Sequence, residues 1–377
     1  MMSKQTMPKA KAKLLNPVGA SRAGHEYHEI WAARKSLQLL LPKSNLAGIA
    51  MEGFDRTDQD AVSKEAAEIA DLTLYYGKGV SFKRADKTVV VQFKYSVSSA
   101  TKELRASEAK KTIGKFADAF RDHIKTHGIE AVKEKLVFEY ITNRPINDGL
   151  QEAVRALAEG VDVAGDIKTQ ATQLSTATKL NGEQLKIFAG KLSFWGGNGN
   201  LRYSKQALAL LVVNWSATND ANAMARLGQL KDLIREKASA QAGQDNVIYQ
   251  TDILHVLGVS DRDELLPSID LPKIGKKVKR EQLAEAVTLI PTLQTPLVIH
   301  AAGGVGKTVF MESIAEALHG SHEVSFFDCF GGGAYRSPED ARHLPKNGLM
   351  QIANSLAFRG LCDPILPGVS DEDALLR

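Results

Sequence analysis

The segment Thr88-Val-Val-Val-Gln-Phe-Lys-Tyr95 decides the fold class of the first part of this chain. Its β-branched and aromatic residues favour an extended strand. Two earlier stretches, Leu46–Met51 and Ala70–Tyr76, also predict strands. Further along, a long helix is predicted over about Lys102–His127 and another buried strand over Lys135–Thr142. Strands with a long helix between them indicate an α/β layer architecture.

Helices are predicted on both sides of these strands. Apolar residues recur at helical spacing from about His25 to Leu41, and Pro42 should end that helix. From Asn147 to Leu257 the pattern is mostly helical, with a turn at the glycine-rich residues 196–200. The stretch Ala221–Gln241 is typical of an amphipathic helix. We therefore expect the sheet to carry a helical extension.

The composition excludes several classes of protein. The chain has 377 residues, 44% hydrophobic and 24% charged, as in a soluble globular protein. Its longest apolar stretch, Ala207–Val213, is far shorter than the roughly 20 residues that cross a bilayer, and no secretory signal is recognisable. Two cysteines, Cys329 and Cys362, are too few for a disulfide framework or a cysteine-rich zinc site. A reducing cytoplasm is the expected compartment, and the net charge of +4 permits a nucleic-acid partner without requiring one.

Changes in composition divide the chain into four parts. Residues 1–22 carry lysines and prolines without periodicity and predict a flexible basic tail. Residues 23–257 form the predicted sheet domain with its helical extension. Residues 258–279 are charged and proline-containing, as expected of a linker, and residues 280–377 begin a second domain. That domain should open with a helix over Glu281–Ile290.

The segment Leu297-Val-Ile-His-Ala-Ala-Gly-Gly-Val-Gly-Lys-Thr308 is the strongest functional signal. It predicts a strand over Pro296–His300, a glycine-rich turn and a helix over Thr308–Leu318, the arrangement of a phosphate-binding loop. Glycines let backbone N–H groups wrap a phosphate, and the helix N-terminus adds positive dipole character. The lysine reaches the terminal phosphates, and the threonine hydroxyl ligates Mg²⁺. The residues assigned to nucleotide binding are Gly303, Gly304, Gly306, Lys307 and Thr308.

Polar residues at three predicted strands form the second signal. Glu52 follows one strand, Asp71 opens the next, and Gln92 and Lys94 project from the same face of the third because side chains two apart in a strand point the same way. If the last two strands are antiparallel neighbours, Asp71 can meet Gln92 and Lys94. Glu52, Asp71 and the Gln92 oxygen would then hold Mg²⁺, with Lys94 orienting or deprotonating the attacking water. Such a set suits phosphodiester hydrolysis, whereas by spacing alone these residues also fit solvent-facing positions of half-buried strands.

The order of helix, Glu, strand with Asp, strand with Gln-x-Lys and helix resembles the PD-(D/E)xK nuclease fold. More specifically, Gly24-His-Glu-Tyr-His-Glu29 and Val91-Gln-Phe-Lys-Tyr95 resemble the double-stranded DNA endonuclease domain of CBASS effectors, as does the later Phe138-Glu-Tyr-Ile-Thr-Asn-Arg144. The resemblance spans residues 20–250 and implies a mixed sheet flanked by helices. A glutamine stands here where the (D/E)xK signature has an acid.

The second domain resembles STAND signalling NTPases through Gly-Gly-Val-Gly-Lys-Thr308 and the segment Phe327–Arg336, although Ala301 replaces the usual first glycine. The resemblance implies ATP as the nucleotide. A nuclease ahead of a STAND NTPase resembles AVAST antiviral proteins. It implies an ATP-regulated antiphage effector that assembles into a homo-oligomer, with a tetramer suspected, when a region beyond Arg377 senses a phage protein, and that then cuts double-stranded DNA. Two alternatives stay open: a DNA-binding scaffold without catalysis, and an ATP-driven restriction enzyme that translocates along DNA.

Other candidate sites are weaker. His25-Glu-Tyr-His28 spaces its histidines at i+3, whereas the zinc motif HExxH needs i+4, so zinc is not expected. His28 or Glu29 on the first helix is left open as a neighbour of the nuclease site. A second strand is predicted over Glu323–Phe330. Asp328 ends its apolar run as a Walker B acid does, but that acid is more readily expected beyond Arg377.

Overall fold

The computed structural model describes residues 17–41, 44–59, 63, 68–197, 201–216, 220–239, 245–262, 265, 275, 277–329 and 345–362. These fall into two compact units that divide between Asp261 and Arg262. Each unit is described by itself. Pro42, most of the predicted linker and the segment from Phe330 to Arg336 lie outside the described residues.

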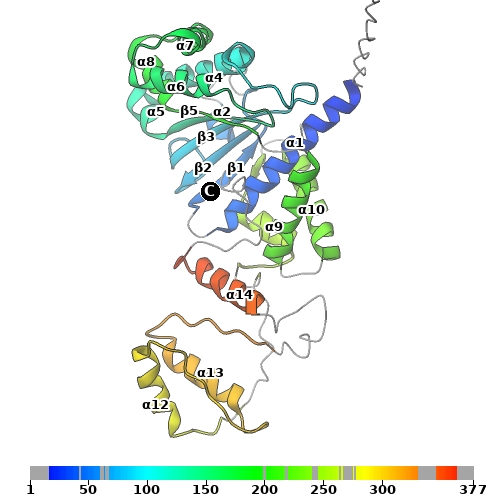
Figure 1. Cartoon of the computed structure of the whole chain (residues 1–377), viewed down its shortest axis with the longest axis vertical. Coiled ribbons are helices and arrows are strands. Elements are labelled where there is room, and N and C mark those ends of the chain that lie inside the picture. The colour runs from blue at the N-terminus through cyan, green and yellow to red at the C-terminus, as the bar shows by residue number, and fades with distance from the viewer. Residues whose placement is uncertain are drawn as a thin grey trace, which may run out of the picture. The chain divides into compact units, whose positions relative to one another are not determined.

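A mixed six-stranded sheet forms the centre of the N-terminal unit, in the order β5-β4-β3-β2-β1-β6 (Figure 1). The strands are β1 (Leu46–Met51), β2 (Leu72–Gly77), β3 (Ala85–Lys94), β4 (Leu136–Thr142), β5 (Leu192–Trp195) and β6 (Val247–Ile248). β6, β1, β2 and β3 pair antiparallel in turn, whereas β3, β4 and β5 pair parallel. The predicted α/β class with a mixed sheet flanked by helices is therefore confirmed.

Helices surround this sheet. They are α1 (Pro17–Leu37), η1 (Gln38–Leu40), α2 (Arg56–Gln59), α4 (Ala106–His127), α5 (Ile129–Lys135), α6 (Asp148–Glu159), α7 (Gly165–Thr178), α8 (Gly182–Gly190), α9 (Leu201–Ser216), α10 (Asp220–Ala238) and α11 (Gln250–Leu257). The first helix begins at Pro17 rather than near His25, so it overlaps the tail predicted over residues 1–22. Proline is well suited to a first helical turn, because it has no N–H to leave unsatisfied there.

The two faces of the sheet have different covers. Val90 packs into a core with α4 and α8, where the rings of Phe116 and Phe138 lie 5.0 Å apart. Phe93 lies three residues after Val90 in β3 and therefore points to the opposite face of the sheet. There it contacts Tyr27 and Trp31 of α1. Figure 1 shows α4, α6, α7 and α8 gathered along the sheet, with α1 beside α9 and α10. Burying each such aromatic side chain stabilises the fold by about 1.5–3 kcal/mol.

The second unit contains α12 (Gln282–Leu289), η4 (Ile290–Thr292), α13 (Lys307–Leu318) and α14 (Pro345–Phe358). A small core joins Ala286 of α12 to Ile314 and Leu318 of α13. The predicted helices over 281–290 and 308–318 are thus confirmed within a residue.

The two strands predicted in this unit do not form in its described part. Residues 296–300 and 323–329 have no sheet pairing there, and residue 330 is not described. A strand is stabilised by hydrogen bonds to a neighbouring strand, and the described residues supply none here, although Ile299 and Val324 pack against the small core. The consequence is visible at Val298, whose side chain is 81% exposed.

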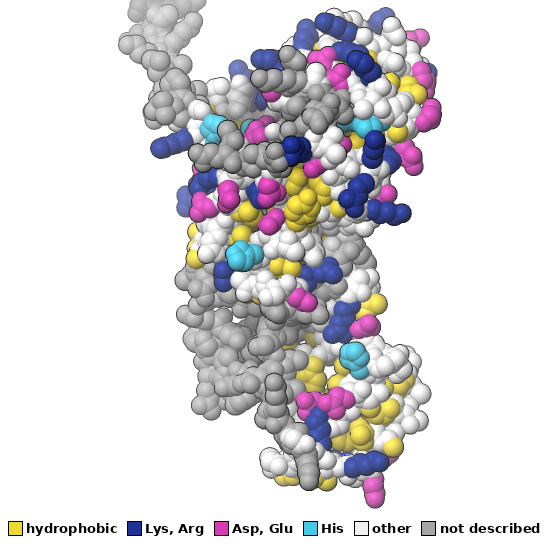
Figure 2. All heavy atoms as spheres, turned by 180° about the vertical axis from the view of Figure 1, so that it is seen from behind, with side chains coloured by type: hydrophobic (Ala, Val, Ile, Leu, Met, Phe, Trp, Pro, Cys, Tyr) yellow, Lys and Arg dark blue, Asp and Glu magenta, His cyan; other side chains and the backbone are white. Residues whose placement is uncertain are grey.

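Charges of both signs are distributed over the surface. On the face shown in Figure 2, lysine and arginine side chains are interspersed with acidic ones. Within the described ranges, no helix is both long enough and apolar enough to cross a membrane.

Candidate active site

Three neighbouring strands bring Glu52, Asp71 and Gln92 together. β1 and β2 pair Met51 with Leu72, and β2 and β3 pair Leu72 with Val91. Because both pairings are antiparallel, Glu52 after Met51, Asp71 before Leu72 and Gln92 after Val91 fall in one row across the sheet. The Glu52 N–H donates to the Asp71 carbonyl at 3.0 Å, and the Asp71 N–H donates to the Val91 carbonyl at 2.9 Å. The predicted antiparallel pairing that lets Asp71 meet Gln92 is confirmed.

The carboxylate of Asp71 is held firmly. Its Oδ2 accepts hydrogen bonds from Gln92 Nε2 at 2.5 Å and from the Phe93 backbone N–H at 2.6 Å. Both bonds fall on the same oxygen and fix the orientation of the carboxylate. Burial raises the pKa of Asp71, and His28, the Phe93 amide and Lys94 oppose that rise. Gln92 thus meets Asp71 through its amide nitrogen, and its role as an oxygen ligand to a metal stays a prediction.

Glu52 stands at a sharp change of backbone direction. It has a φ of 48°, and Gly53 follows at 134°. Such a conformation is uncommon for a residue other than glycine and costs about 1–3 kcal/mol, and it is found disproportionately at functional sites. Although much of the side chain is accessible, desolvation of the carboxylate and the nearby charge of Asp71 raise the pKa of Glu52 to about 7.

His28 of α1 joins these two acids. Its Nδ1 lies 3.8 Å from Asp71 Oδ2, and its ring centroid lies 5.5 Å from that of Phe93. Burial lowers its pKa, which favours the neutral imidazole. Glu29, the other residue left open by the sequence, points elsewhere and accepts two hydrogen bonds from Arg235 at 2.8 and 2.9 Å. The buried stripe of Tyr27, Ile30 and Trp31 was the signal that could have placed His28 at the edge of the packed face.

His28, Glu52 and Asp71 each offer one ligand atom, and these atoms lie within 4.8 Å of one another. Ligands about 2.1 Å from one ion lie up to about 4.2 Å apart, so small side-chain adjustments would let the three share a cation. Two carboxylates and an imidazole are suitable donors, and the residues present therefore fit a divalent metal.

Lys94 ends β3 on the same face as Gln92 and is exposed. Its charge lowers the pKa of both Asp71 and His28, so it stands within electrostatic reach of the cluster. The grouping predicted for Glu52, Asp71, Gln92 and Lys94 is therefore present at one end of the sheet.

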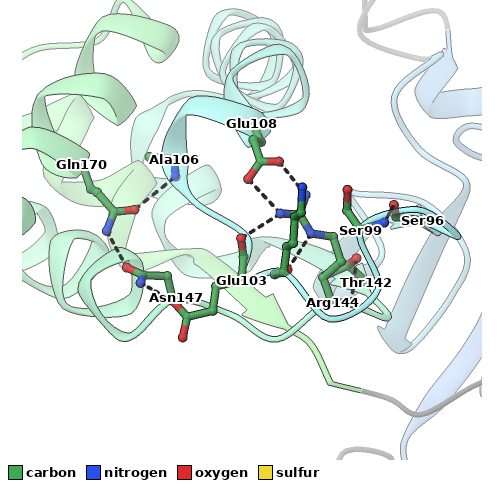
Figure 3. Close-up of polar contacts among 10 residues, drawn as sticks. Ser96, Ser99, Glu103, Ala106, Glu108, Thr142, Arg144, Asn147 and Gln170 are labelled. Carbon is green, nitrogen blue, oxygen red and sulfur yellow. Dashed lines mark hydrogen bonds and ion pairs between the residues drawn. The ribbon is translucent and has the colours of Figure 1, made fainter. Parts of the chain in front are cut away.

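A buried network, which the sequence did not reveal, fixes the loop that follows Lys94. Arg144, just after β4, makes a two-pronged ion pair with Glu108 at 2.9 and 2.8 Å and also donates to the carbonyls of Lys102 and Glu103 (Figure 3). The pair holds the pKa of Glu108 below its usual range. Nearby, the Asn143 side chain bonds both the N–H and the carbonyl of Ser96 at 2.9 Å.

The glycine-rich loop of the second unit contains two glycines with positive φ. Gly304 and Gly306 have φ values of 76° and 83°, and α13 begins directly afterwards with Lys307 and Thr308. The Lys307 ammonium group donates to the carbonyls of Ala301 and Ala302 at 2.8 and 2.9 Å. A hollow of about 460 Å³ borders this loop. Its lining includes Arg280, His300, Val305, Gly306 and Lys307.

No family model matches the sequence, and no curated protein matches it. Three solved structures are similar in part. The Cap4 SAVED/CARF-domain containing receptor of Moraxella osloensis matches 80% of this chain and 62% of its own, with 15% identity and a TM-score of 0.38. The Acinetobacter baumannii Cap4 receptor matches in two structures. One, solved with a cyclic trinucleotide, has 15% identity, a TM-score of 0.36 and coverage of 72% of this chain and 51% of its own. The other has 12% identity, a TM-score of 0.37 and coverage of 92% and 61%. This chain therefore spans between about half and three-fifths of the length of each.

Proposed function

We propose that the N-terminal unit is a metal-dependent endonuclease that hydrolyses phosphodiester bonds in double-stranded DNA. One observation carries the proposal: Glu52, Asp71 and Gln92 stand in a row across β1, β2 and β3, and Lys94 projects from the same face two residues further on. Glu52 and Asp71 would hold Mg²⁺, which polarises the phosphate and lowers the pKa of a bound water. Gln92 and the Phe93 amide orient Asp71 toward that ion.

Phosphodiester hydrolysis also needs a positive side chain beside these acids, and Lys94 would supply it. Its ammonium group would orient the attacking water and balance the charge on the phosphate. Because Lys94 is exposed at a strand end, a DNA backbone can reach it without rearrangement of the core.

Plasmid cleavage tests this proposal. With Mg²⁺ or Mn²⁺ and supercoiled DNA, Lys94→Ala and Asp71→Asn should each lower the cleavage rate by about 10²-fold or more. Lys87→Ala is the matched control, since Lys87 is an exposed lysine on the same strand whose ammonium group lies over the Tyr76 ring. Unaltered cutting by Lys94→Ala would refute the assignment. Binding of DNA without cutting under all conditions, including ATP and an activating phage protein, would favour the scaffold alternative.

We also propose that the second unit binds ATP with Mg²⁺ through Gly303, Gly304, Gly306, Lys307 and Thr308. The left-handed glycines followed by the start of α13 support it, because that geometry aims backbone N–H groups and a helix dipole at a phosphate. Lys307→Ala should abolish binding of a fluorescent ATP analogue. Lys279, an exposed lysine of the same unit, provides the control variant Lys279→Ala. Retained affinity in Lys307→Ala would overturn the proposal.

Together these activities suit an ATP-regulated antiphage effector, in which nucleotide binding favours an assembled state with active nuclease domains. A ligand shifts such an equilibrium only by binding one state more tightly. Sedimentation with and without ATP therefore tests the switch. ATP consumption that rises with DNA length would instead support the translocating enzyme.

A further inference from the structure

We infer that His28 is a third ligand in the Glu52–Asp71 metal site and that it makes this site prefer divalent transition ions such as Mn²⁺ over Mg²⁺. The inference rests on the proposed metal-dependent function and specifies which ions that site takes. Glu52, Asp71 and Gln92 offer a metal only oxygen atoms as ligands. His28 would therefore add the one nitrogen ligand of this set.

The position of His28 carries the first part of the argument. It reaches the two acids from α1, whereas Glu52 and Asp71 come from the ends of β1 and β2. Its Nδ1 is 3.8 Å from Asp71 Oδ2, too far for a hydrogen bond but within the separation of two ligands of one ion. Three donors from three separate elements surround a point rather than lie along a line.

The orientation of the imidazole carries the second part. The imidazole packs on Phe93, and the two ring centroids lie 5.5 Å apart. Such packing fixes the orientation of the ring, which a metal ligand requires. The same Phe93 donates its N–H to Asp71, so one residue orients two of the three ligands.

The anchoring of α1 carries the third part. Tyr27 and Trp31, on either side of His28, are buried against Phe93. Glu29 is tied to Arg235 of α10. His28 therefore sits on a rigid element, as a ligand needs to.

The donor set decides the metal. Mg²⁺ favours oxygen ligands almost exclusively, while imidazole nitrogen suits transition ions, whose affinity rises from Mn²⁺ along the first row. Two carboxylates and one imidazole thus form a mixed site that still admits Mg²⁺ but binds Mn²⁺ more tightly. His25, one helical turn earlier and exposed, is outside the cluster and offers a matched control.

Electron paramagnetic resonance of Mn²⁺ on the full chain tests the inference without relying on cleavage. The wild type and His25→Ala should show electron-spin-echo modulation from a directly bound ¹⁴N, and His28→Ala and His28→Gln should lose it. His28→Ala should also lower the affinity for Mn²⁺ by at least about tenfold and the affinity for Mg²⁺ by much less. Loss even of a residue that only supports a ligand typically lowers metal affinity 10–100-fold. Circular dichroism verifies that each variant is folded.

The outcomes separate the two proposals. Bound Mn²⁺ without nitrogen modulation in the wild type, or equal Mn²⁺ affinity in folded His28→Ala, would overturn the role of His28 and leave the two-acid site standing. Mn²⁺ binding that survives Asp71→Asn with its nitrogen modulation intact would place the ion elsewhere and would overturn both.

Discussion

Replacing Arg144 with alanine should destabilise the N-terminal unit by about 3 kcal/mol, because three partners lose their donor at once. The Arg144 side chain is only 9% exposed and serves the Glu108 carboxylate together with the carbonyls of Lys102 and Glu103. Each carbonyl left unsatisfied costs about 1–3 kcal/mol if it stays dry. Glu108 is 46% exposed and can be rehydrated, so its share of the loss is small.

Urea unfolding followed by circular dichroism measures this loss, provided the slope with denaturant is unchanged. Arg105→Ala is the matched control: Arg105 lies in the same connection and pairs with Asp166 at the surface, where such pairs contribute about 0–1 kcal/mol. Arg144→Lys should recover only part of the stability, since one ammonium group cannot reproduce the planar fork. A loss below about 1 kcal/mol in Arg144→Ala would refute the assignment of a buried clamp, because surface pairs reach that value.

Three further predictions concern titration and backbone strain. The folded-state pKa of Glu52 is raised to about 7 from 4.5, so the metal-free protein should lose stability as pH rises through that interval. Urea titrations at each pH measure this, and in Glu52→Gln the unfolding free energy should depend less on pH. Burial lowers the pKa of His123 to about 4, so its contribution is present above about pH 6.5 and is lost as pH falls toward 4; acid unfolding of His123→Gln should show a weaker pH dependence over that range. Gly306 has a φ of 83°, so Gly306→Ala should lower the free energy of unfolding by about 1–2 kcal/mol and weaken binding of the ATP analogue. A variant that binds the analogue as tightly as the wild type would contradict the role of the loop backbone.

Most of the sheet could be predicted because its strands carry their signal locally. The strand over Leu46–Met51 is found with the predicted bounds, and β2 and β3 lie within three residues of theirs. The spacing of Gln92 and Lys94 placed them on one face, and the antiparallel pairing then brought Asp71 to Gln92. Alternation along a strand is a property of the backbone, so it survives whatever packs around it.

The remaining features depend on contacts between distant residues. Arg144 and Glu108 are 36 residues apart in the sequence, and nothing in either local sequence indicates that they pair. β6 has two residues, too short for a periodic pattern, and it forms because β1 offers an open edge. The apolar run Pro296–His300 shows the converse: a strong local strand signal without a paired neighbour in the described part of its unit.

Helix α1 shows how one element can be both an anchor and a source of a ligand. Successive residues on a helix are about 100° apart, so Glu29 and His28 cannot share a direction. Glu26 and Glu29 meet Lys205, Lys231 and Arg235 of α9 and α10, while His28 faces the ends of β1 and β2. The buried contacts of Tyr27 and Trp31 with Phe93 hold α1 against the sheet, and these ion pairs support the same orientation of the helix. Because a ligand must be held within about 0.5 Å, charges that do not touch the proposed metal site would contribute to its affinity.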